Sequence, residues 1–439
     1  MVAYAMLLAL LVGQPNEHIA STEDIGLAWS GHSVGFDMLV TADHQYITWY
    51  DQERRMMIAG RTLPDGEWVR AELPERIGWD SHNYITITAD DEGLLHLAGN
   101  MHVHPLKYYR TTRPWDVTSF EAAAPMVGDL EQRVTYPSFF RGPNNQLIFT
   151  YRDGASGDGS QIYNAWDQAT HTWSRLMDQP LTDGEGQRNA YFVGPTLGPD
   201  GWWHMIWVWR ETPDCATNHD LSYARSRDLR HWERSDGTPL ALPITLATAE
   251  IVAPVPVGGG LLNGNTRLGF DQLWRPIISY HRHDDDAGNT QIFSRRLEDG
   301  VWVEYQQTDW DYRWEFSGGG TIIGEIGVGG VVLDQEARLR HNWSHRVKGG
   351  GTYYIDPETL RPIGAVARQP LVTDGLGKPE GTFEGLRTRW INRAGADGTR
   401  WALRWETLDA NRDRPRPEPW PEPSILRLYE IRPGPAPQP

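Results

Sequence analysis

The sequence predicts an all-β fold, and three observations support this class. Runs such as "QLIFTYRDG" (146–154) and "PIISYHRH" (276–283) are rich in β-branched and aromatic residues and show the two-residue periodicity of strands. Turn-forming pairs such as "PDG" (64–66) and "EDG" (298–300) separate these runs. We find no convincing amphipathic helix, because no segment repeats its apolar residues with the helical period.

A turn followed by tryptophan recurs along the chain and indicates internal repeats. The copies are "PDGEW" (64–68), "QATHTW" (168–173), "RDLRHW" (227–232) and "EDGVW" (298–302), with "TRPWDV" (112–117) as a degenerate copy. The spacing leaves room for four short strands in each unit. Seven four-stranded antiparallel units predict a seven-bladed β-propeller.

The seven units follow one another without a linker, so we predict a single domain over residues 25–435 after an N-terminal segment, 1–24. The first two units cover about 34–73 and 82–120, and the next three cover 134–176, 189–235 and 263–308. The sixth begins at "GGGTIIGEI" (318–326) and the seventh at "LRTRWINR" (386–393). We expect "IGLAWS" (25–30) to complete the last blade, and the Pro-rich stretch 411–423 to form a long loop. Two β-sandwich domains are the alternative.

Composition and charge exclude several classes of protein. The 439 residues carry a formal net charge of −17, which makes general nucleic-acid binding a poor interpretation. An anionic substrate would need a locally basic site. One cysteine forms no intrachain disulfide. The apolar run Ala3–Val12 has the length of a signal peptide but no positive region before it, and we expect a secreted or periplasmic protein, a monomer without a membrane span.

Polar residues gather in the second to fifth units, at the start of one strand and the end of the next. In an antiparallel pair these two positions face each other at the same rim. The predicted rim residues are His82, Asn83, His102, Tyr136, Arg152, Tyr191, Arg210 and His281. Arginine binds a carboxylate bidentately, and histidine and tyrosine transfer protons, so the set fits an acidic sugar.

Several histidines and rim residues also have a purely structural interpretation. His96 alternates within "LLHLAGN" and is predicted to be packed in a strand, whereas His104 stays undecided. Tyr136 could be a core residue with a satisfied hydroxyl, and Arg152 could form an ion pair with Asp153 or with a residue of another blade.

Cys215 and His219, with His204 upstream, form a candidate zinc site. Thiolate and imidazole are ligands that zinc prefers. The alternative is that Cys215 is a small buried residue. A structural zinc ion is the one cofactor considered, and no organic cofactor is expected.

Several long motifs resemble one family. "HNYITITADDEGLLHLAGNMHVHPLKYYR", "RVTYPSFFR", "IFTYRDGASGDGSQIYN", "NAYFVGP" and "VWRETPDCATNHDLSYARSRDLRHWE" are similar to BNR-repeat propellers that include ulvan lyases and rhamnose–glucuronate lyases. The resemblance is strong over about 80–325 and implies a lyase that cleaves a uronate-containing polysaccharide or oligosaccharide by β-elimination.

The resemblance also implies roles for single residues. His82, His102, Tyr136 and Arg152 match the histidine, tyrosine and arginine motifs of these lyases, with Asn83, Tyr191, Arg210 and His281 as substrate-binding candidates. Some members hold a structural zinc through histidine and cysteine, for which Cys215, His204 and His219 are the candidates here.

The residue types suit this chemistry. Arg152 would neutralise the uronate carboxylate, while His82 and Tyr136, with His102 as partner, would handle protons. Tyrosine could act as a base only if nearby cations lowered its pKa.

Two other functions stay open. A sialidase-like glycoside hydrolase would need a carboxylic acid at the site, for which Asp37, Asp153 and Asp220 are candidates. A glycan-binding propeller without catalytic activity would need no His–Tyr–Arg set.

Overall fold

Antiparallel sheets build the part of the chain that the structure describes. The structure is a computed structural model, and it describes residues 17–369 and 371–434. Its strands form seven sheets of four to six strands each, and every sheet contains antiparallel pairs. The helical elements described are four 3₁₀ turns: η1 (Val117–Ser119), η2 (Pro143–Asn145), η3 (Cys215–Thr217) and η4 (Asp374–Leu376). The predicted all-β class is therefore confirmed.

The first sheet contains β2 (Asp37–Val40), β3 (His44–Tyr50), β4 (Arg55–Thr62) and β5 (Val69–Arg76). The second contains β6 (Ile85–Ala89), β7 (Leu95–Gly99), β9 (Tyr108–Thr111) and β10 (Phe120–Ala122). The third contains β8 (His102–His104), β11 (Val134–Arg141), β12 (Leu147–Ala155), β13 (Asp158–Asp167) and β14 (Thr172–Arg175). The fourth contains β15 (Asn189–Leu197), β16 (Trp203–Arg210), β17 (Asn218–Ser226), β18 (Trp232–Glu233), β19 (Pro239–Leu240) and β20 (Glu250–Ala253).

The fifth sheet contains β21 (Arg267–Phe270), β22 (Pro276–His283), β23 (Thr290–Glu298) and β24 (Val301–Gln306). The sixth contains β25 (Ile326–Val328), β26 (Val332–Leu333), β27 (Leu339–His345), β28 (Gly351–Ile355) and β29 (Pro362–Ala365). The last combines β30 (Arg387–Ala394), β31 (Arg400–Thr407) and β32 (Ser424–Pro433) with β1 (Glu17–Ala28). Seven separate sheets do not fit the alternative of two sandwiches.

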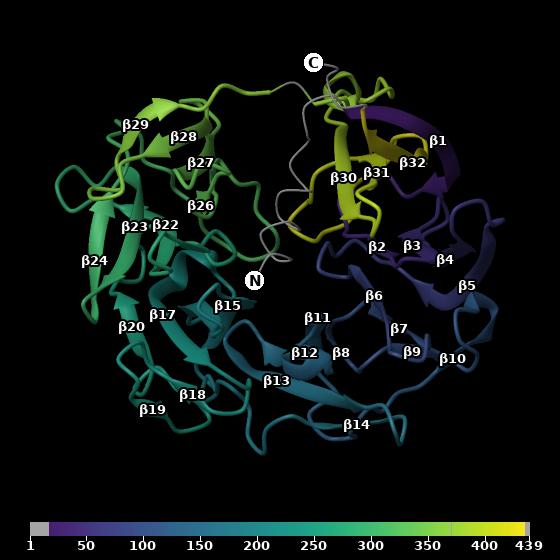
Figure 1. Cartoon of the computed structure of the whole chain (residues 1–439), viewed down its shortest axis with the longest axis horizontal. Helices are drawn as coiled ribbons and strands as arrows, with labels where there is room; N and C mark the ends of the chain where they lie inside the picture. Colours follow the sequence, from purple (N-terminus) through teal and green to yellow (C-terminus); the bar gives the residue numbers. More distant parts are fainter. Residues whose placement is uncertain (1–16, 370, 435–439) are drawn as a thin grey trace.

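The sheets follow one another in chain order around a common centre (Figure 1). The first strand, β1, pairs with the last, β32, from Glu17 opposite Pro433 to Ala28 opposite Ser424. The strand predicted at 25–30 therefore joins the last sheet over residues 25–28, but β1 begins earlier, at Glu17, and ends at Ala28. The sequence does not reveal residues 17–24 as part of this strand. Their segment, "EHIASTED", lacks the alternation of apolar and polar residues that marks a half-buried strand.

Two boundaries differ from the prediction. The sequence analysis assigned His102 to the second unit. In the structure His102 lies on β8, which pairs with β11 and belongs to the third sheet. The glycine-rich residues 318–325 form a loop before β25. A three-residue strand and a glycine-rich loop carry no periodicity that could reveal them.

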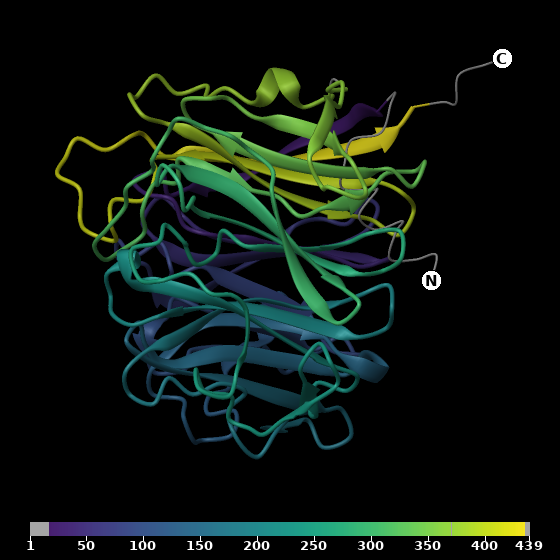
Figure 2. The ribbon, with the colours of Figure 1, turned by 90° about the vertical axis from the view of Figure 1, so that its left-hand side faces the viewer.

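Apolar side chains fill the space between neighbouring sheets. Phe36, before β2, stacks on Trp405 of β31 with ring centroids 4.6 Å apart, which joins the first sheet to the last. The predicted Pro-rich loop connects β31 to β32 and extends beyond the strands on one side of the molecule (Figure 2). No helix in the described residues is long and apolar enough to cross a membrane. The apolar run Ala3–Val12 lies outside the described residues.

Candidate active site

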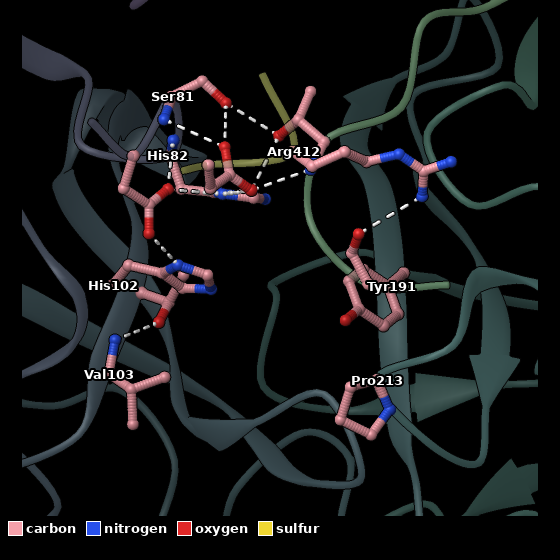
Figure 3. A network of polar contacts seen from close by, with 12 residues as sticks. Ser81, His82, His102, Val103, Tyr191, Pro213 and Arg412 are labelled. Atoms are coloured by element: carbon pink, nitrogen blue, oxygen red, sulfur yellow. Dashed lines mark hydrogen bonds and ion pairs between the residues drawn. The ribbon is translucent and has the colours of Figure 1, made fainter. Parts of the chain in front are cut away.

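Two histidines from different parts of the chain share one carboxylate. His82 lies between β5 and β6, and its Nδ1 is 2.7 Å from Asp80 Oδ1. His102 begins β8, and its Nδ1 is 2.5 Å from Asp80 Oδ2. Their rings stack with centroids 4.2 Å apart, and Figure 3 shows the two residues next to each other. The two predicted histidines therefore form a pair.

A second carboxylate reaches His82 from the Pro-rich loop. Asp413 Oδ2 lies 3.4 Å from His82 Nδ1. Burial alone would lower the pKa of His82, but the hydrogen bonds and charges of Asp413 and Asp80 outweigh it and raise this pKa to about 9. Burial would raise the pKa of Asp80, yet its hydrogen bonds to His102 and His82 hold it well below its ordinary range. His82 is therefore an imidazolium cation near neutral pH.

Tyr136 lies beside this pair on a distorted strand. The pairing of β11 with β12 shifts register between Thr135 and Ser138, and Tyr136 has a φ of 59°. Its ring centroid is 5.7 Å from that of His82 and 6.1 Å from that of Tyr191. Burial, with the neighbouring Tyr191, raises the pKa of Tyr136, although nearby arginines oppose this. Tyr136 is therefore a neutral phenol.

Arg152 is a buried cation without an acidic partner. It lies on β12 with 1% of its surface exposed. Its guanidinium donates to Thr135 Oγ1 at 3.1 Å and to the Tyr191 hydroxyl at 3.4 Å, and lies 5.0 Å from the Tyr136 ring centroid. No ion pair of the described residues includes Arg152, whose hydrogen bonds go to neutral hydroxyls, so the ion pair with Asp153 is absent. A buried charge without a counter-ion is costly, and a bound carboxylate would compensate it.

Tyr191 and Arg210 continue this group on the fourth sheet. Tyr191 lies on β15, and the guanidinium groups of Arg152 and Arg210 lie 5.9 and 5.5 Å from its ring centroid. Arg210, at the end of β16, donates to the carbonyls of Thr212 and Pro213 and to Asn263. In Figure 3 Tyr191 and Pro213 lie across from His82 and His102.

Two cavities meet at this group. The larger, about 940 Å³, is lined by His82 and Tyr136 and also by residues of the last sheet. The smaller, about 490 Å³, is lined by Arg152 and Tyr191. Tyr136 and Tyr84 line both cavities. An extended ligand could therefore pass from Arg152 to His82 along Tyr136.

Of the four predicted substrate-binding residues, Tyr191 lines the smaller cavity, whereas Asn83, Arg210 and His281 are absent from both linings. His281 on β22 is fully buried, with its ring 5.3 Å from that of Trp314, and burial lowers its pKa to about 3. Asn83 is also buried, and its carbonyl accepts a hydrogen bond from Tyr50. Neither burial nor absence from these linings tests a role in binding, so both assignments stay predictions. The strand position alone does not show which side chains the neighbouring sheet covers.

The predicted zinc ligands do not meet. On paired β16 and β17, His204 lies opposite Arg225 and His219 opposite Trp209. Because His219 lies opposite Trp209, its distance from His204 along the strands is that between positions 204 and 209. Five residues at about 3.3 Å each separate these positions by about 16 Å. His204 bonds instead to Tyr223 and Asp200, and His219 to Glu211 and Asp220. Cys215 is buried. Because His204 and His219 lie far apart along the strands, the three residues do not form one site.

Asp80, His82 and His102 are the one group in the described residues with three potential metal-ligand atoms within 4.8 Å of one another. Their contacts of 2.7 and 2.5 Å are hydrogen-bond lengths. Two ligand atoms on a tetrahedral zinc ion, each about 2.0 Å from the metal, would be about 3.3 Å apart. The group is therefore a hydrogen-bonded cluster, and we assign no metal to it.

Sequence reasoning missed both carboxylates of the histidine pair. Asp80 stands two residues before His82 in "WDSHNY", and this spacing could have indicated it. Asp413 follows Ser81, its hydrogen-bond partner, by 332 positions, and no local pattern links the two. The histidine predicted to be structural, His96, is fully buried and bonds to the Tyr108 hydroxyl, whereas His104 is exposed.

Comparison with known proteins decides the family. The model described as "BNR repeat-containing family member" matches residues 44–310. The chain belongs to the BNR repeat-containing family. The resemblance found in the sequence is thereby confirmed. This BNR-repeat protein is also 23% identical over 209 residues to "Ulvan lyase, long isoform" of Pseudoalteromonas sp. (strain PLSV), a match that covers 36% of the chain but 21% of that longer protein.

Solved structures share the fold of this BNR-repeat protein. The match to the crystal structure of polysaccharide lyase Uly1 covers 96% of this chain and 100% of the Uly1 chain. Its TM-score is 0.62, and the sequence identity is 16%. A PL25 ulvan lyase bound to -[GlcA(1-4)Rha3S]- covers 94% of the chain and 96% of its own, with a TM-score of 0.57 and 14% identity. At this identity the likeness concerns the fold alone.

Proposed function

We propose that this protein is a polysaccharide lyase that cleaves a uronic-acid polysaccharide by β-elimination, on a single closed seven-bladed propeller. The ring order of the seven sheets and the pairing of β1 with β32 support the propeller. The observation that carries the activity is Arg152, a buried cation without a carboxylate partner, beside Tyr136 and the histidine pair.

The electron flow of β-elimination assigns Arg152 its role. A base removes the C5 proton of the uronate, the C4=C5 double bond forms, the C4–O4 bond breaks, and O4 leaves with a proton. Negative charge develops on the uronate carboxylate during the first of these changes. A cation already fixed beside that carboxylate stabilises the charge where it appears. Arg152 is therefore proposed to bind the carboxylate in the smaller cavity.

The proton transfers are assigned to Tyr136, His82 and His102. Because burial keeps Tyr136 neutral, its hydroxyl is suited to give a proton to O4 and not to take one from C5. This replaces the hypothesis of a tyrosine base with a lowered pKa. The histidine pair then supplies the proton acceptor.

The larger cavity supports an anionic polymer as substrate. Lys378, Arg387 and Arg389 line it. The one carboxylate that the described residues contribute to its lining is Asp409, which lies 2.6 Å from Arg389 and 3.7 Å from Arg387. The cavity is thus locally basic on a chain with a net charge of −17. A polyanion could continue from Arg152 into this cavity.

The relatives support the sugar that we propose. One relative is an ulvan lyase, and one solved neighbour is bound to -[GlcA(1-4)Rha3S]-. We propose a glucuronate–rhamnose linkage of ulvan type for this chain. A polymer of this kind is met outside the cytoplasm, which fits the proposed secreted or periplasmic location.

A hydrolase is less well supported. Most glycoside hydrolases use two carboxyl groups that flank the bond, and the sialidase-like alternative still needs a carboxylic acid at the site. Among the described residues, Asp409 is the one carboxylate that lines either cavity, and it pairs with two arginines. The candidates Asp37, Asp153 and Asp220 line neither cavity.

The products formed from a panel of uronate polysaccharides test this proposal. Ultraviolet absorbance of an unsaturated uronate is expected with ulvan, because elimination leaves a C4=C5 double bond. Tyr136→Phe should lower the rate by about 10²–10⁴-fold without a loss of melting temperature, as expected for an acid–base group. His96→Gln is the control and should lower stability more than rate.

New reducing ends without absorbance would instead indicate a hydrolase, and binding without products a glycan-binding protein. Either outcome would contradict the lyase proposal.

A further inference from the structure

The two histidines of the pair have unequal surroundings. Both contact Asp80, at 2.7 Å from His82 and 2.5 Å from His102. His82 alone also contacts Asp413, at 3.4 Å. Two carboxylates therefore face His82, while His102 shares one. Groups of the same type in different environments are how proteins separate an acid from a base.

Asp413 is held firmly in this position. Its Oδ1 accepts hydrogen bonds from the backbone N–H of Ser81 at 3.1 Å and from the Ser81 hydroxyl at 2.7 Å. Its Oδ2 accepts one from the backbone N–H of Thr321 at 2.7 Å. Asp413 thus joins the loop that carries His82, the glycine-rich loop before β25 and the Pro-rich loop. Figure 3 shows Ser81 and Arg412 at this junction.

The charge of Asp413 is directed to His82. The neighbouring Arg412 donates to the carbonyls of Ser317 and Gly319. Within the described residues, His82 is the one cationic side chain within ion-pair distance of Asp413. Arg412 and Asp413 both have left-handed backbone, with φ of 54° and 59°. This conformation is uncommon for residues other than glycine and persists where the surroundings enforce it.

We propose that Asp413 is a positioning residue that separates the roles of the two histidines: it holds His82 as the charged member of the pair and leaves His102 as the proton acceptor. The proposal rests on the lyase function proposed above. His102 Nδ1 bonds to Asp80, so His102 Nε2 is the atom that would take the C5 proton. The electron pair of that C–H bond forms the C4=C5 double bond, the C4–O4 pair leaves on O4, and Tyr136 protonates it. His82 adds a second positive charge near the reacting sugar, because the Tyr136 ring centroid lies 5.7 Å from the His82 ring and 5.0 Å from the Arg152 guanidinium.

Four groups decide the charge of His82. Asp80 and Asp413 favour its protonated form, and the stacked His102 and the neutral Tyr136 complete its surroundings. Removal of the Asp413 charge should lower the pKa of His82 from about 9, because an opposite charge at this distance is worth about 1–3 pH units.

The pH dependence of kcat/KM for Asp413→Asn tests this assignment. The asparagine keeps the shape and a hydrogen-bonding oxygen but removes the charge. The alkaline limb of the profile should move about 1 pH unit or more to lower pH, while the acid limb stays in place. Asp80→Asn removes the carboxylate common to both histidines and should move both limbs. Asp158→Asn, at an exposed ion pair with Arg133, is the charge-matched control and should move neither.

The histidine signals in nuclear magnetic resonance give a readout that needs no activity. In protein with labelled histidines, the signal that disappears in the His82→Gln variant identifies His82. The pH midpoint at which this signal titrates should be lower in the Asp413→Asn variant than in the wild type. An unchanged midpoint, or acid and alkaline limbs that move together in Asp413→Asn, would overturn the role of Asp413. A wild-type protein without lyase activity would refute the proposed function, and the midpoint would still test the coupling of Asp413 to His82.

Discussion

Tyr136 shows how a strand can present one side chain to two cavities. A regular strand would turn alternate side chains to opposite faces. The register shift after Thr135 and the φ of 59° break this alternation at Tyr136. A left-handed backbone costs about 1–2 kcal/mol for such a residue. The distortion places the phenol where both cavities meet.

Arg152 illustrates a conflict between stability and the proposed activity. Its charge is buried and has no carboxylate partner in the described residues, so it is a liability for the unliganded protein. The hydroxyl of Thr135, which accepts its hydrogen bond, also accepts one from Val103 N–H at 2.8 Å. Loss of the guanidinium therefore leaves no unsatisfied partner at Thr135.

Arg152→Met is predicted to abolish most activity without loss of stability. Methionine keeps much of the volume but cannot neutralise the substrate carboxylate. The rate of unsaturated-product formation should fall about 10²–10³-fold, the loss typical of one charge-stabilising donor. The melting temperature should stay equal or rise, because a buried charge is removed. A fall in melting temperature with a proportionate fall in rate would instead assign Arg152 a structural role.

The first strand, β1, ties the start of the described chain to its end. Glu17 lies 2.6 Å from Arg400 of β31, and both side chains are almost fully buried. On the same strand Asp24 pairs with Arg427, but the Asp24 side chain is 56% exposed. The two ion pairs differ mainly in solvent access, so they provide a matched comparison.

Glu17→Ala is predicted to destabilise the protein far more than Asp24→Ala. Removal of one partner of a buried pair leaves an uncompensated charge and costs about 3–5 kcal/mol, whereas an exposed pair contributes about 0–1 kcal/mol. Denaturant unfolding measures both free energies. The double variant Glu17→Ala/Arg400→Met should recover part of the loss. Equal effects of the two single variants would show that β1 is not held by this buried pair.

The elements differ in how far sequence could predict them. Long strands such as β12 and β22 were visible because apolar periodicity is a local property. The strand β8 and the start of β1 were not, since partners distant in sequence hold them. The same distinction holds at the site. His82, Tyr136 and Arg152 stand in recognisable motifs, but the contact of Asp413 with His82 depends on how the last loop folds back.

At the scale of the whole molecule, three buried histidines lie far apart in the sequence and share one property. His32, His281 and His341 are buried, and burial lowers their pKa values to about 4, 3 and 4. All three are therefore neutral in the folded protein down to these values. In the unfolded chain, histidine takes up a proton near pH 6.5.

The sign of the pH dependence follows from this difference. Below about pH 6.5 the unfolded chain binds more protons than the folded protein, so stability falls as pH falls. His82 has the opposite sign, because its pKa is raised to about 9 in the folded protein. Its contribution is complete below about pH 6.5 and is lost as pH rises through 9. Stability should therefore be greatest near pH 6.5.

The acid side of this profile is predicted to be steep, and His281 allows a test. Each proton taken up on unfolding changes the free energy of unfolding by about 1.4 kcal/mol per pH unit, so the three buried histidines together give about 4 kcal/mol per pH unit. Denaturant unfolding at several pH values between about 4.5 and 6 measures this slope. His281→Phe fits the apolar contact with Trp314 and should reduce the slope by about one proton. His231→Gln, whose side chain is 90% exposed, should leave it unchanged. A wild-type slope equal to that of His281→Phe would show that His281 is already protonated in the folded protein.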